Sequence, residues 1–559
     1  MSSEVAARPS PLDAVADQIR RTGDAVSSLR PAYALGALLA VQWLAVLALA
    51  LTVKHNGWLY YAGGDQLWHY SGAYLLAHGH LPPAFVGYGW SVLLLPIALV
   101  AGPNLVSALP AIVLLNTVVL LPIALLCTYG IAARIAGRLF GYFAAALWIG
   151  LPYLGITFVE PGYHQKYTEL TLPQLVGLTS VPDFPSMVAL LVAAYFCLRA
   201  LDGAGWHFAA AAGLAAGYSI AIKPSNSIFL FAPVVLLLVK RWRALAWFAA
   251  GLAPALLTLA LWKYRGLGVL AATPAEPVRT AAGIDSLLNR IHNPSLNSWE
   301  HLHQVLLGLR EHFWVARVIE WLPLAGLVGL LARSRRGFLL VGTWFIVYLL
   351  LKATYIPASI EDASFFRIMM PAFPAYLLLS AAVVLLVPGF RARPAPIRRA
   401  PLPRTNLVVA IAAATAVFVV FPLGVIAATP PLHDGGRLAV RAGNSLVPVS
   451  SKIGLRAAVD GDAVRLSWRA RPAGTGSVFY RVMRAKGSNA IGCAGILNKA
   501  ADDCRLYVDL TGATRTTSGV DKPGPGTWTY GIGVAANWLN DPSLGDIYVV
   551  SPLVTVTVR

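Results

Sequence analysis

The chain has 559 residues, of which 57% are hydrophobic and only 12% are charged. Soluble proteins carry about 25% charged residues, so one water-exposed globular core cannot accommodate so apolar a composition. The formal net charge of +19 requires no nucleic-acid partner, because basic loops between membrane segments supply much of it. The composition therefore excludes an ordinary soluble domain and indicates a membrane protein.

The first 31 residues are polar, and we expect them to form a cytoplasmic N-terminal segment (1–31). Three arginines, Arg20, Arg21 and Arg30, stand close to the first apolar segment. No small-residue cleavage site follows a short apolar core, so the pattern favours an uncleaved anchor over a removable signal peptide.

Apolar segments of about 20 residues recur up to position 428, as expected for membrane-spanning helices. Short basic loops at 134–138, 240–243, 333–336 and 390–404 fix the orientation if all of them lie in the cytoplasm. About eleven spans then place the N-terminus inside and the C-terminal region outside the cytoplasm. The predicted spans are 32–53, 104–131, 139–158, 183–200, 206–222, 226–239, 244–262, 313–331, 338–352, 367–387 and 405–428, within a membrane domain over 32–428.

Residues 87–102, "GYGWSVLLLPIALVAG", are apolar but too few to cross a bilayer comfortably. A crossing here would also move Arg134 and Arg138 to the outer side. We therefore expect a helix that dips into the outer leaflet beside protein neighbours. The alternative is a true span, with extra crossings elsewhere.

The last part of the chain, 440–559, is polar and alternates apolar with polar residues, which is typical of strands. Turn residues separate four such runs, at 463–470, 477–485, 526–538 and 547–559. The pattern predicts a small all-β sandwich outside the cytoplasm, and it resembles a fibronectin type III-like domain. In that resemblance Trp468 matches a core tryptophan and 525–537 matches a late strand. Trp528, Tyr530 and Trp538 are either core aromatics or a surface that stacks on sugar rings.

The four cysteines divide between the two regions. Cys127 and Cys197 fall in apolar spans, where buried thiols are usually inert packing residues. Cys493 and Cys504 lie in the β region, where an oxidising compartment favours a disulfide between them.

The stretch "GGDQLWHYSGAYLLAHGHLPP" (63–83) places an aspartate and three histidines between two apolar segments. Asp65 is a suitable N-cap for a short helix over 66–78, and Gly79 is a suitable stop. His69 follows Asp65 by four residues, so both side chains can share one side of that helix. A capped helix lying at the membrane surface explains the stretch as well as the edge of an active site does.

Several segments, in this order, resemble the C-type glycosyltransferase superfamily, which includes protein O-mannosyltransferases and aminoarabinose transferases. An Asp after the first span with a short aromatic helix resembles the family's first loop, although Gln66 stands where the family often has a second acid. Residues 87–104 and 114–141 resemble the next two segments. The sequence "SVPDFPSMVALL" resembles the later acid that opens a span, here Asp183, and "AIKPSN" resembles a Lys-Pro break, here Lys223. The resemblance covers about residues 35–265.

This resemblance implies a polytopic α-helical fold and a polyprenyl-phosphate-linked sugar donor. Transfer to an acceptor hydroxyl requires a base and positive charge at the leaving phosphate. We predict Asp65 as the base and Asp183 as a second carboxylate that orients the acceptor or binds a divalent cation. The remaining predicted contacts to donor or acceptor are His69, His164, Lys166, Lys223, Lys352 and Arg367.

Each of these residues has a plainer interpretation. Asp183 fits an N-cap of its own span, and Lys223 fits a lysine that snorkels from a helix end. His164 and Lys166 fit a loop that only shapes the entrance. His292, His301 and His303 suggest a metal site, but a solvated amphipathic helix explains them better because no further ligand completes the motif.

Three functions compete on the sequence. The first is a membrane glycosyltransferase that acts on a glycan, lipid or protein acceptor at the outer face of the cell membrane and inverts the anomeric carbon. The second is a lipid-linked-glycan ligase, polymerase or flippase, and the third is a transporter or receptor with an outer binding domain. A transporter should hold ionisable residues at mid-membrane, whereas here they gather at the ends of spans, which favours the first function.

Overall fold

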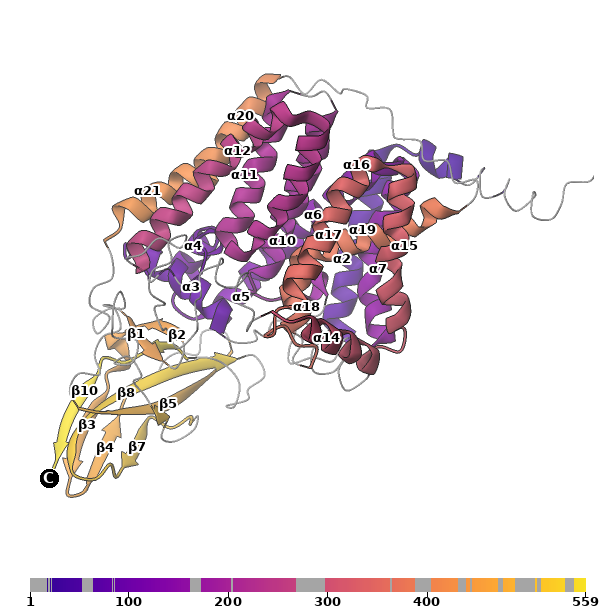
Figure 1. Cartoon of the computed structure of the whole chain (residues 1–559). Helices are drawn as coiled ribbons and strands as arrows, with labels where there is room; N and C mark the ends of the chain where they lie inside the picture. The colour runs from indigo at the N-terminus through magenta and orange to yellow at the C-terminus, as the bar shows by residue number, and fades with distance from the viewer. Residues whose placement is uncertain are drawn as a thin grey trace, which may run out of the picture.

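The computed structural model shows a bundle of long helices with a smaller set of strands at one end (Figure 1). The residues that the structure describes are 18, 21, 23–52, 64–82, 84, 86–160, 172–202, 205–267, 297–361, 364–387, 404–430, 439–442, 445–470, 476–487, 508–509, 514–537 and 547–559. The fold class is therefore a polytopic α-helical membrane protein followed by a small β region.

Every predicted span coincides with helix. The helices are α2 (Pro31–Thr52), α5 (Leu105–Leu114), η1 (Leu115–Leu120), α6 (Leu121–Ala136), α7 (Arg138–Phe158), α10 (Asp183–Leu201), α11 (Trp206–Ile222), η2 (Pro224–Leu230), α12 (Phe231–Leu267), α15 (Ala316–Arg333), α16 (Arg335–Gly337), η3 (Phe338–Gly342), α17 (Thr343–Lys352), α18 (Ser364–Met369), η4 (Met370–Ala372), α19 (Phe373–Ala382), η5 (Val383–Leu386), α20 (Arg404–Thr415), η6 (Ala416–Val420) and α21 (Phe421–Ala428). Among the described residues, 6 helices are long and apolar enough to cross a membrane, with 224–266 counted once.

That long helix is broken at Arg241, whose dihedrals (φ −161°, ψ 67°) are not helical. The break falls in the basic loop 240–243, between the predicted spans 226–239 and 244–262. The helix geometry is therefore consistent with two spans in this segment rather than one. The guanidinium of Arg241 donates to the carbonyl of Ala200, which ties the break to the end of α10.

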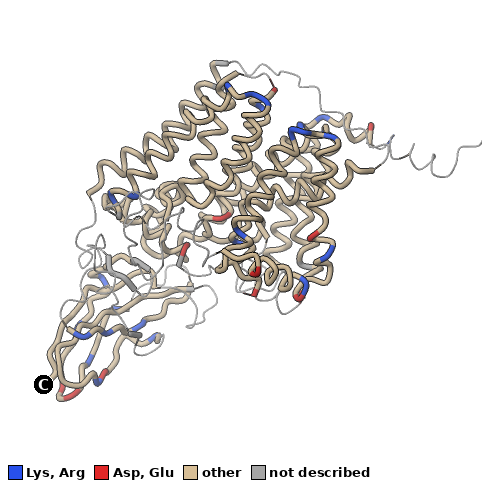
Figure 2. Tube along the Cα trace, in the orientation of Figure 1, with Lys and Arg blue, Asp and Glu red and all other residues tan. Residues whose placement is uncertain are grey.

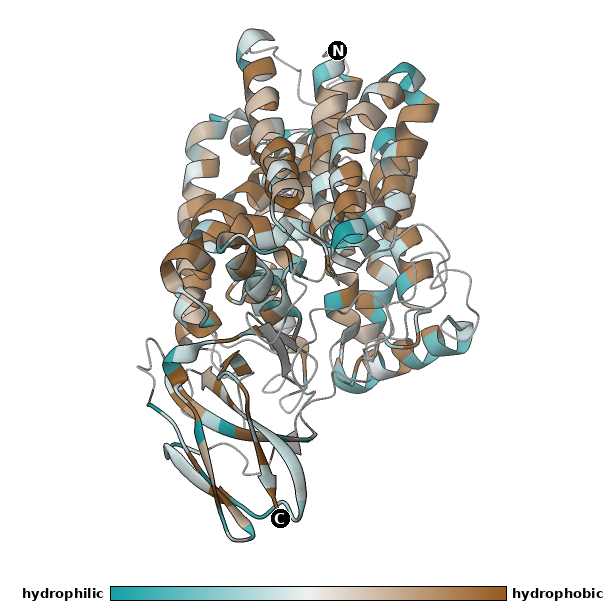
Figure 3. Ribbon diagram, turned by 90° about the vertical axis from the view of Figure 1, so that its left-hand side faces the viewer, coloured by the Kyte–Doolittle hydropathy of each residue, from teal (hydrophilic) through white to brown (hydrophobic). Residues whose placement is uncertain are grey.

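The predicted basic loops at 134–138, 240–243 and 333–336 lie at one end of the bundle (Figure 2). Asp202 accepts a hydrogen bond from Arg134 at 3.1 Å and lies 3.7 Å from Arg336, so two of these loops share one carboxylate. The helices α3 (Gly64–Ala77), α4 (Gly89–Ala101) and α14 (Trp299–His312) and all the strands lie toward the opposite end (Figures 1 and 2). The bundle between them is predominantly hydrophobic (Figure 3).

Helix α4 has 13 residues and rises about 20 Å, which is short of the roughly 30 Å hydrocarbon core. Its length therefore agrees with the prediction of a helix that does not span. Its N-terminus packs directly on the C-terminal end of α11. A methyl group on Gly87 would lie 2.0 Å from the carbonyl oxygen of Ala221, and Tyr218 Oη donates to the Gly89 carbonyl at 2.8 Å. Only glycine permits this approach.

Helix α14 is amphipathic, as the solvated-helix interpretation of the histidine segment predicts. Ser298 caps it by accepting from the backbone of Glu300 and His301, and His301 Nε2 lies 2.7 Å from the Ala358 carbonyl. No group of three or more His, Cys, Asp or Glu able to hold a metal occurs among the described residues. His292 lies outside them.

The strands form two antiparallel sheets and a hairpin, which confirms an all-β region with strands at the predicted runs. One sheet has the order β10-β8-β5-β6 with β9 also paired to β8, the other has the order β3-β4-β7, and β1 pairs with β2. The strands are β1 (Ala439–Ala442), β2 (Ser445–Pro448), β3 (Arg456–Asp460), β4 (Ala463–Ser467), β5 (Ser477–Lys486), β6 (Val508–Asp509), β7 (Ser518–Asp521), β8 (Gly526–Asn537), β9 (Ile547–Val550) and β10 (Val554–Val558).

The β region has its own core, in which Trp468 is buried with its ring 5.9 Å from that of Tyr480. The predicted role of Trp468 as a core residue is therefore confirmed, and the fibronectin-like assignment stays a prediction. Cys127 and Cys197 are buried free thiols, as predicted. Cys493, Cys504 and Trp538 lie outside the described residues, so the disulfide stays a prediction.

The β region is packed on α3. Leu67 and Tyr70 of α3 share one apolar cluster with Val447 of β2, and Leu81 N–H donates to the Pro430 carbonyl at 3.0 Å. Residues Gln66, His69 and Tyr70 are each at most 2% exposed. Helix α3 is thus not a helix lying on the membrane surface, but a buried support that carries Asp65.

Candidate active site

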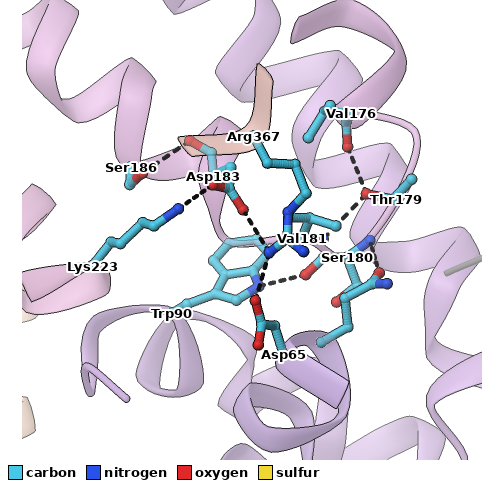
Figure 4. A network of polar contacts seen from close by, with 11 residues as sticks. Asp65, Trp90, Val176, Thr179, Ser180, Val181, Asp183, Ser186, Lys223 and Arg367 are labelled. Carbon is cyan, nitrogen blue, oxygen red and sulfur yellow. Dashed lines mark hydrogen bonds and ion pairs between the residues drawn. The ribbon is translucent and has the colours of Figure 1, made fainter. Parts of the chain in front are cut away.

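Four charged side chains from distant parts of the sequence meet at the start of α3 and α10 (Figure 4). Arg367 Nη2 donates to Asp65 Oδ2 at 2.5 Å and lies 3.4 Å from Asp183 Oδ2. Lys223 Nζ donates to the other oxygen, Asp183 Oδ1. We call Asp65, Asp183, Lys223 and Arg367 the charge cluster. The sequence predicted all four as site residues, and the structure brings them together.

Three members of the charge cluster stand at helix ends for a local reason, whereas Arg367 lies within α18 (Ser364–Met369). Asp183 is the first residue of α10, after Pro182, and Asp65 lies in the first turn of α3, where a helix favours negative charge. Lys223 is extended (φ −133°, ψ 99°) because the following Pro224 disfavours helical dihedrals. The ends of the apolar helices α10 and α11 thus place Asp183 and Lys223 in the charge cluster.

The two carboxylates of the charge cluster differ in their exposure to solvent. The Asp183 side chain is fully buried, and its partners Lys223 and Arg367 are 25% and 22% exposed. A buried carboxylate is stable only when it is paired with a cation, and Asp183 is paired with both Lys223 and Arg367. The Asp65 side chain is 47% exposed, so Asp65 is the carboxylate that a ligand can reach.

The plainer interpretations of these residues do not hold in the structure. The N-cap of α10 is Pro182 and makes no side-chain cap bond, so the Asp183 carboxylate serves the charge cluster instead. The Lys223 ammonium turns inward to Asp183 rather than snorkelling to the interface. Helix α3 begins at Gly64, which places Asp65 one position inside the helix rather than at the predicted N-cap.

Gln66 points away from the charge cluster and fixes the chain that leads to Asp183. Its Oε1 accepts from the Ser180 N–H at 2.8 Å, and Trp90 Nε1 donates to the Ser180 carbonyl at 3.0 Å. Asn116 Nδ2 holds the carbonyls of Gly177 and Thr179 from another side, at 3.0 and 3.1 Å. These hydrogen bonds to residues 177–180 were not predicted from the sequence. The one sequence feature that pointed to them is the amide of Gln66, directly after the candidate base.

His69 lies one turn after Asp65 and is 2% exposed. Burial lowers its pKa to about 4, and the nearby carboxylates of Asp65 and Asp183 oppose this shift only in part. In the described part of the chain its Nδ1 has no hydrogen-bond partner. His69 is therefore a neutral, incompletely bonded imidazole beside the charge cluster.

Of the other predicted contacts, Lys352 does not join the charge cluster. Lys352 ends α17 with its ammonium 5.8 Å from the centre of the Tyr355 ring, so the structure does not group it with Lys223 and Arg367. A single loop was expected to bring His164 and Lys166 to the site, and both lie outside the described residues.

These donors need no divalent cation to neutralise them in the ligand-free site. Both carboxylates already share the guanidinium of Arg367, and Gln66 is turned to Ser180. The cation between Asp65 and Asp183 is thus Arg367 itself, and the second carboxylate of the charge cluster needs no metal to be neutralised.

The structure also contains an apolar cavity of about 790 Å³, whose lining includes none of the four charge-cluster residues. It lies among α7, α14, α15, α17, α18 and α19. Phe365, Phe366 and Met369 line it from the same short helix that carries Arg367. Its charged lining residues, Arg310 and Glu320, neutralise one another through two bonds of 2.9 Å. A lipid chain in this cavity would therefore meet a nearly uncharged wall.

No protein-family model matches the chain, and no curated protein matches its sequence. The chain is similar to several solved structures, two of which follow. ArnT from Cupriavidus metallidurans, bound to undecaprenyl phosphate, is 14% identical with a TM-score of 0.39, over 68% of this chain and 63% of that one. The Archaeoglobus fulgidus oligosaccharyltransferase in the apo form is 12% identical with a TM-score of 0.40, over 71% and 56%.

The chain thus matches less than two thirds of the length of either structure. At TM-scores below 0.5, neither likeness establishes an activity or a ligand for this chain.

Proposed function

We propose that the protein is a membrane glycosyltransferase that moves a sugar from a polyprenyl-phosphate donor to an acceptor hydroxyl. The observation that carries the proposal is the charge cluster, in which one accessible carboxylate, Asp65, stands beside a buried carboxylate held by two cations. The order of segments that resemble the C-type superfamily supports the same function.

The reaction needs few groups, and the charge cluster supplies them. The acceptor oxygen attacks the anomeric carbon as its proton passes to the Asp65 carboxylate. The bond from that carbon to the phosphate oxygen breaks, and the phosphate leaves with the electron pair. Arg367 and Lys223 stabilise the charge that develops on the phosphate. A single displacement of this kind inverts the anomeric configuration.

The apolar cavity supports a lipid-linked donor rather than a soluble sugar nucleotide. It is lined largely by aliphatic and aromatic side chains, and three of its lining residues come from α18, the helix that also carries Arg367. A polyprenyl chain in the cavity would place its phosphate at the charged edge, near Arg367. Burial of the chain contributes roughly 25 cal/mol per Å² of apolar surface.

The proposed site faces away from the cytoplasm. The basic loops lie at the opposite end of the bundle from α3 and the strands (Figure 2), and basic loops favour the cytoplasmic side. The N-terminus is then cytoplasmic, and the β region stands beside the site in the extracytoplasmic compartment. The acceptor is a glycan, lipid or protein of the cell envelope.

The direct test supplies purified full-length protein in lipid nanodiscs with a labelled polyprenyl-phosphate sugar and cell-envelope acceptors. Wild type should transfer label and release polyprenyl phosphate, and the product should have the inverted configuration by NMR. An absence of transfer from any lipid-linked donor would overturn the proposal in favour of a flippase or transporter.

A further inference from the structure

We infer that Arg367 masks the candidate base Asp65 until the donor phosphate takes its place, so that the donor must bind before the acceptor is activated. This inference rests on the proposed function. It concerns the order in which the groups of one site act, and it follows from how the cations of the charge cluster are shared.

The charge cluster is balanced without a ligand. Two carboxylates, Asp65 and Asp183, meet two cations, Lys223 and Arg367. An arriving phosphate adds negative charge, and within the charge cluster both described cations already have a carboxylate partner. In partly buried surroundings an unpaired charge is costly, so one carboxylate must give up its partner when the phosphate binds.

Burial decides which carboxylate yields. Asp183 is fully buried and holds Lys223 as well as Arg367, so its release would leave a charge stranded in the interior. Asp65 is 47% exposed and is bonded to Arg367 by one oxygen. Water can replace that bond at little cost, so Asp65 is the carboxylate that leaves.

Arg367 is suited to such an exchange. One nitrogen, Nη2, serves both carboxylates, while its Nε is buried and, in the described part of the chain, has no partner. A guanidinium binds phosphate best through two parallel N–H groups. A phosphate that replaced Asp65 would use donors that the ligand-free site leaves unused.

Release of Asp65 has a chemical consequence. While Arg367 donates to Asp65 Oδ2, that oxygen is occupied and cannot accept from an acceptor hydroxyl. The donor phosphate, by displacing Asp65 from Arg367, frees this oxygen to take the acceptor proton. The same event that positions the donor therefore activates the acceptor.

The test measures binding of farnesyl phosphate, a short polyprenyl phosphate, to the detergent-solubilised full-length protein by isothermal titration calorimetry. If Asp65 competes with phosphate for Arg367, Asp65→Asn should bind the probe about fivefold more tightly than wild type. Glu160→Gln is the matched control, because Glu160 is an exposed carboxylate bonded to His312 at 3.0 Å rather than to the charge cluster. It should leave the affinity unchanged.

A double-mutant cycle separates competition from a general field effect. In an Arg367→Gln background, the gain from Asp65→Asn should disappear, with thermal melting used to verify that each variant is folded. Arg367→Lys provides a second background if the glutamine variant does not fold. There the gain should persist in reduced form, because an ammonium still pairs with Asp65.

The outcomes are distinct. Equal or weaker binding by Asp65→Asn, with wild type binding normally, would overturn the masking and leave the proposed function standing. A gain that survives intact in the Arg367→Gln background would overturn the assignment to Arg367. No binding of the probe by wild type or any variant would overturn both the masking and the proposed function.

Discussion

Two of the clusters in which an arginine contacts an aspartate, the charge cluster and the pair of Arg484 and Asp521 in the β region, are built differently. In the β region, Asp521 accepts from Arg484 Nη1 at 2.9 and 3.2 Å and from Tyr530 Oη at 2.7 Å. The Arg484 guanidinium also covers the Trp528 ring at 4.7 Å. Trp528 is therefore a packing residue on that face rather than an open platform for a sugar ring.

In the charge cluster, one nitrogen of Arg367 is divided between two carboxylates, and its Nε has no partner among the described residues. Asp65 is 47% exposed, against 16% for Asp521. The comparison separates a polar group that stabilises a fold from one that awaits a ligand. In a structural cluster the hydrogen-bond donors are satisfied and water is excluded. In a binding site some donors have no partner and some polar groups are exposed to solvent.

Removal of Asp183 should have the largest effect on stability. Asp183→Asn leaves Lys223 and Arg367 partly buried with one carboxylate between them, which should cost about 3 kcal/mol of unfolding free energy. Transfer should be lost as well. Thermal melting in detergent and the nanodisc transfer assay measure the two effects, and a stable, active variant would contradict the pairing.

The buried His69 makes the stability of the protein depend on pH. Its folded pKa of about 4 lies below the ordinary histidine value of 6.5, so the unfolded chain binds the proton first as the pH falls. Stability from this group is thus complete above pH 6.5 and is lost from there down toward pH 4, by about 3 kcal/mol in all. The melting temperature of His69→Gln should fall less than that of wild type over this range, and identical slopes would contradict the account.

The glycine contact between Gly87 and α11 positions Lys223, and its loss should cost about 1–3 kcal/mol. Gly87→Ala would force a methyl group against the Ala221 carbonyl, 2.0 Å away, and shift the helix end that carries Lys223. Gly150→Ala is the matched control, because nothing lies within 4 Å of that added methyl. Melting curves and transfer rates should fall for Gly87→Ala alone.

Asp521→Asn should have the smallest effect, a loss of about 1–2 kcal/mol in the stability of the β region. Transfer below the melting temperature should be unchanged, because Asp521 belongs to a satisfied structural cluster. A loss of transfer in a folded Asp521→Asn protein would mean that the distinction between the two clusters is wrong.

The four members of the charge cluster could be selected from the sequence because each interrupts an apolar segment. The pairing of these residues could not be predicted from the sequence, because Arg367 lies 302 positions from Asp65 and no local pattern encodes the contact. Lys352 has the same sequence signal as Lys223, a lysine ending an apolar helix, yet it lies elsewhere. The role of Gln66 depends on Ser180 and Trp90, which only the fold brings together.

Some of the strands could be predicted from the sequence and others could not. The long strands β5 and β8 have enough alternation to be predicted, whereas β1, β2, β3 and β7 have only four or five residues each. Such short strands are defined by the neighbours they pair with rather than by their own pattern.

The most direct measurement compares Asp65→Asn and Asp521→Asn side by side in the nanodisc transfer assay with a labelled polyprenyl-phosphate sugar. Both changes replace a carboxylate bonded to an arginine with an amide of the same shape. We predict that Asp65→Asn lowers the transfer rate by about 10²- to 10⁴-fold, as loss of a general base does, and that Asp521→Asn transfers at the wild-type rate. Equal transfer by wild type and Asp65→Asn would contradict the account.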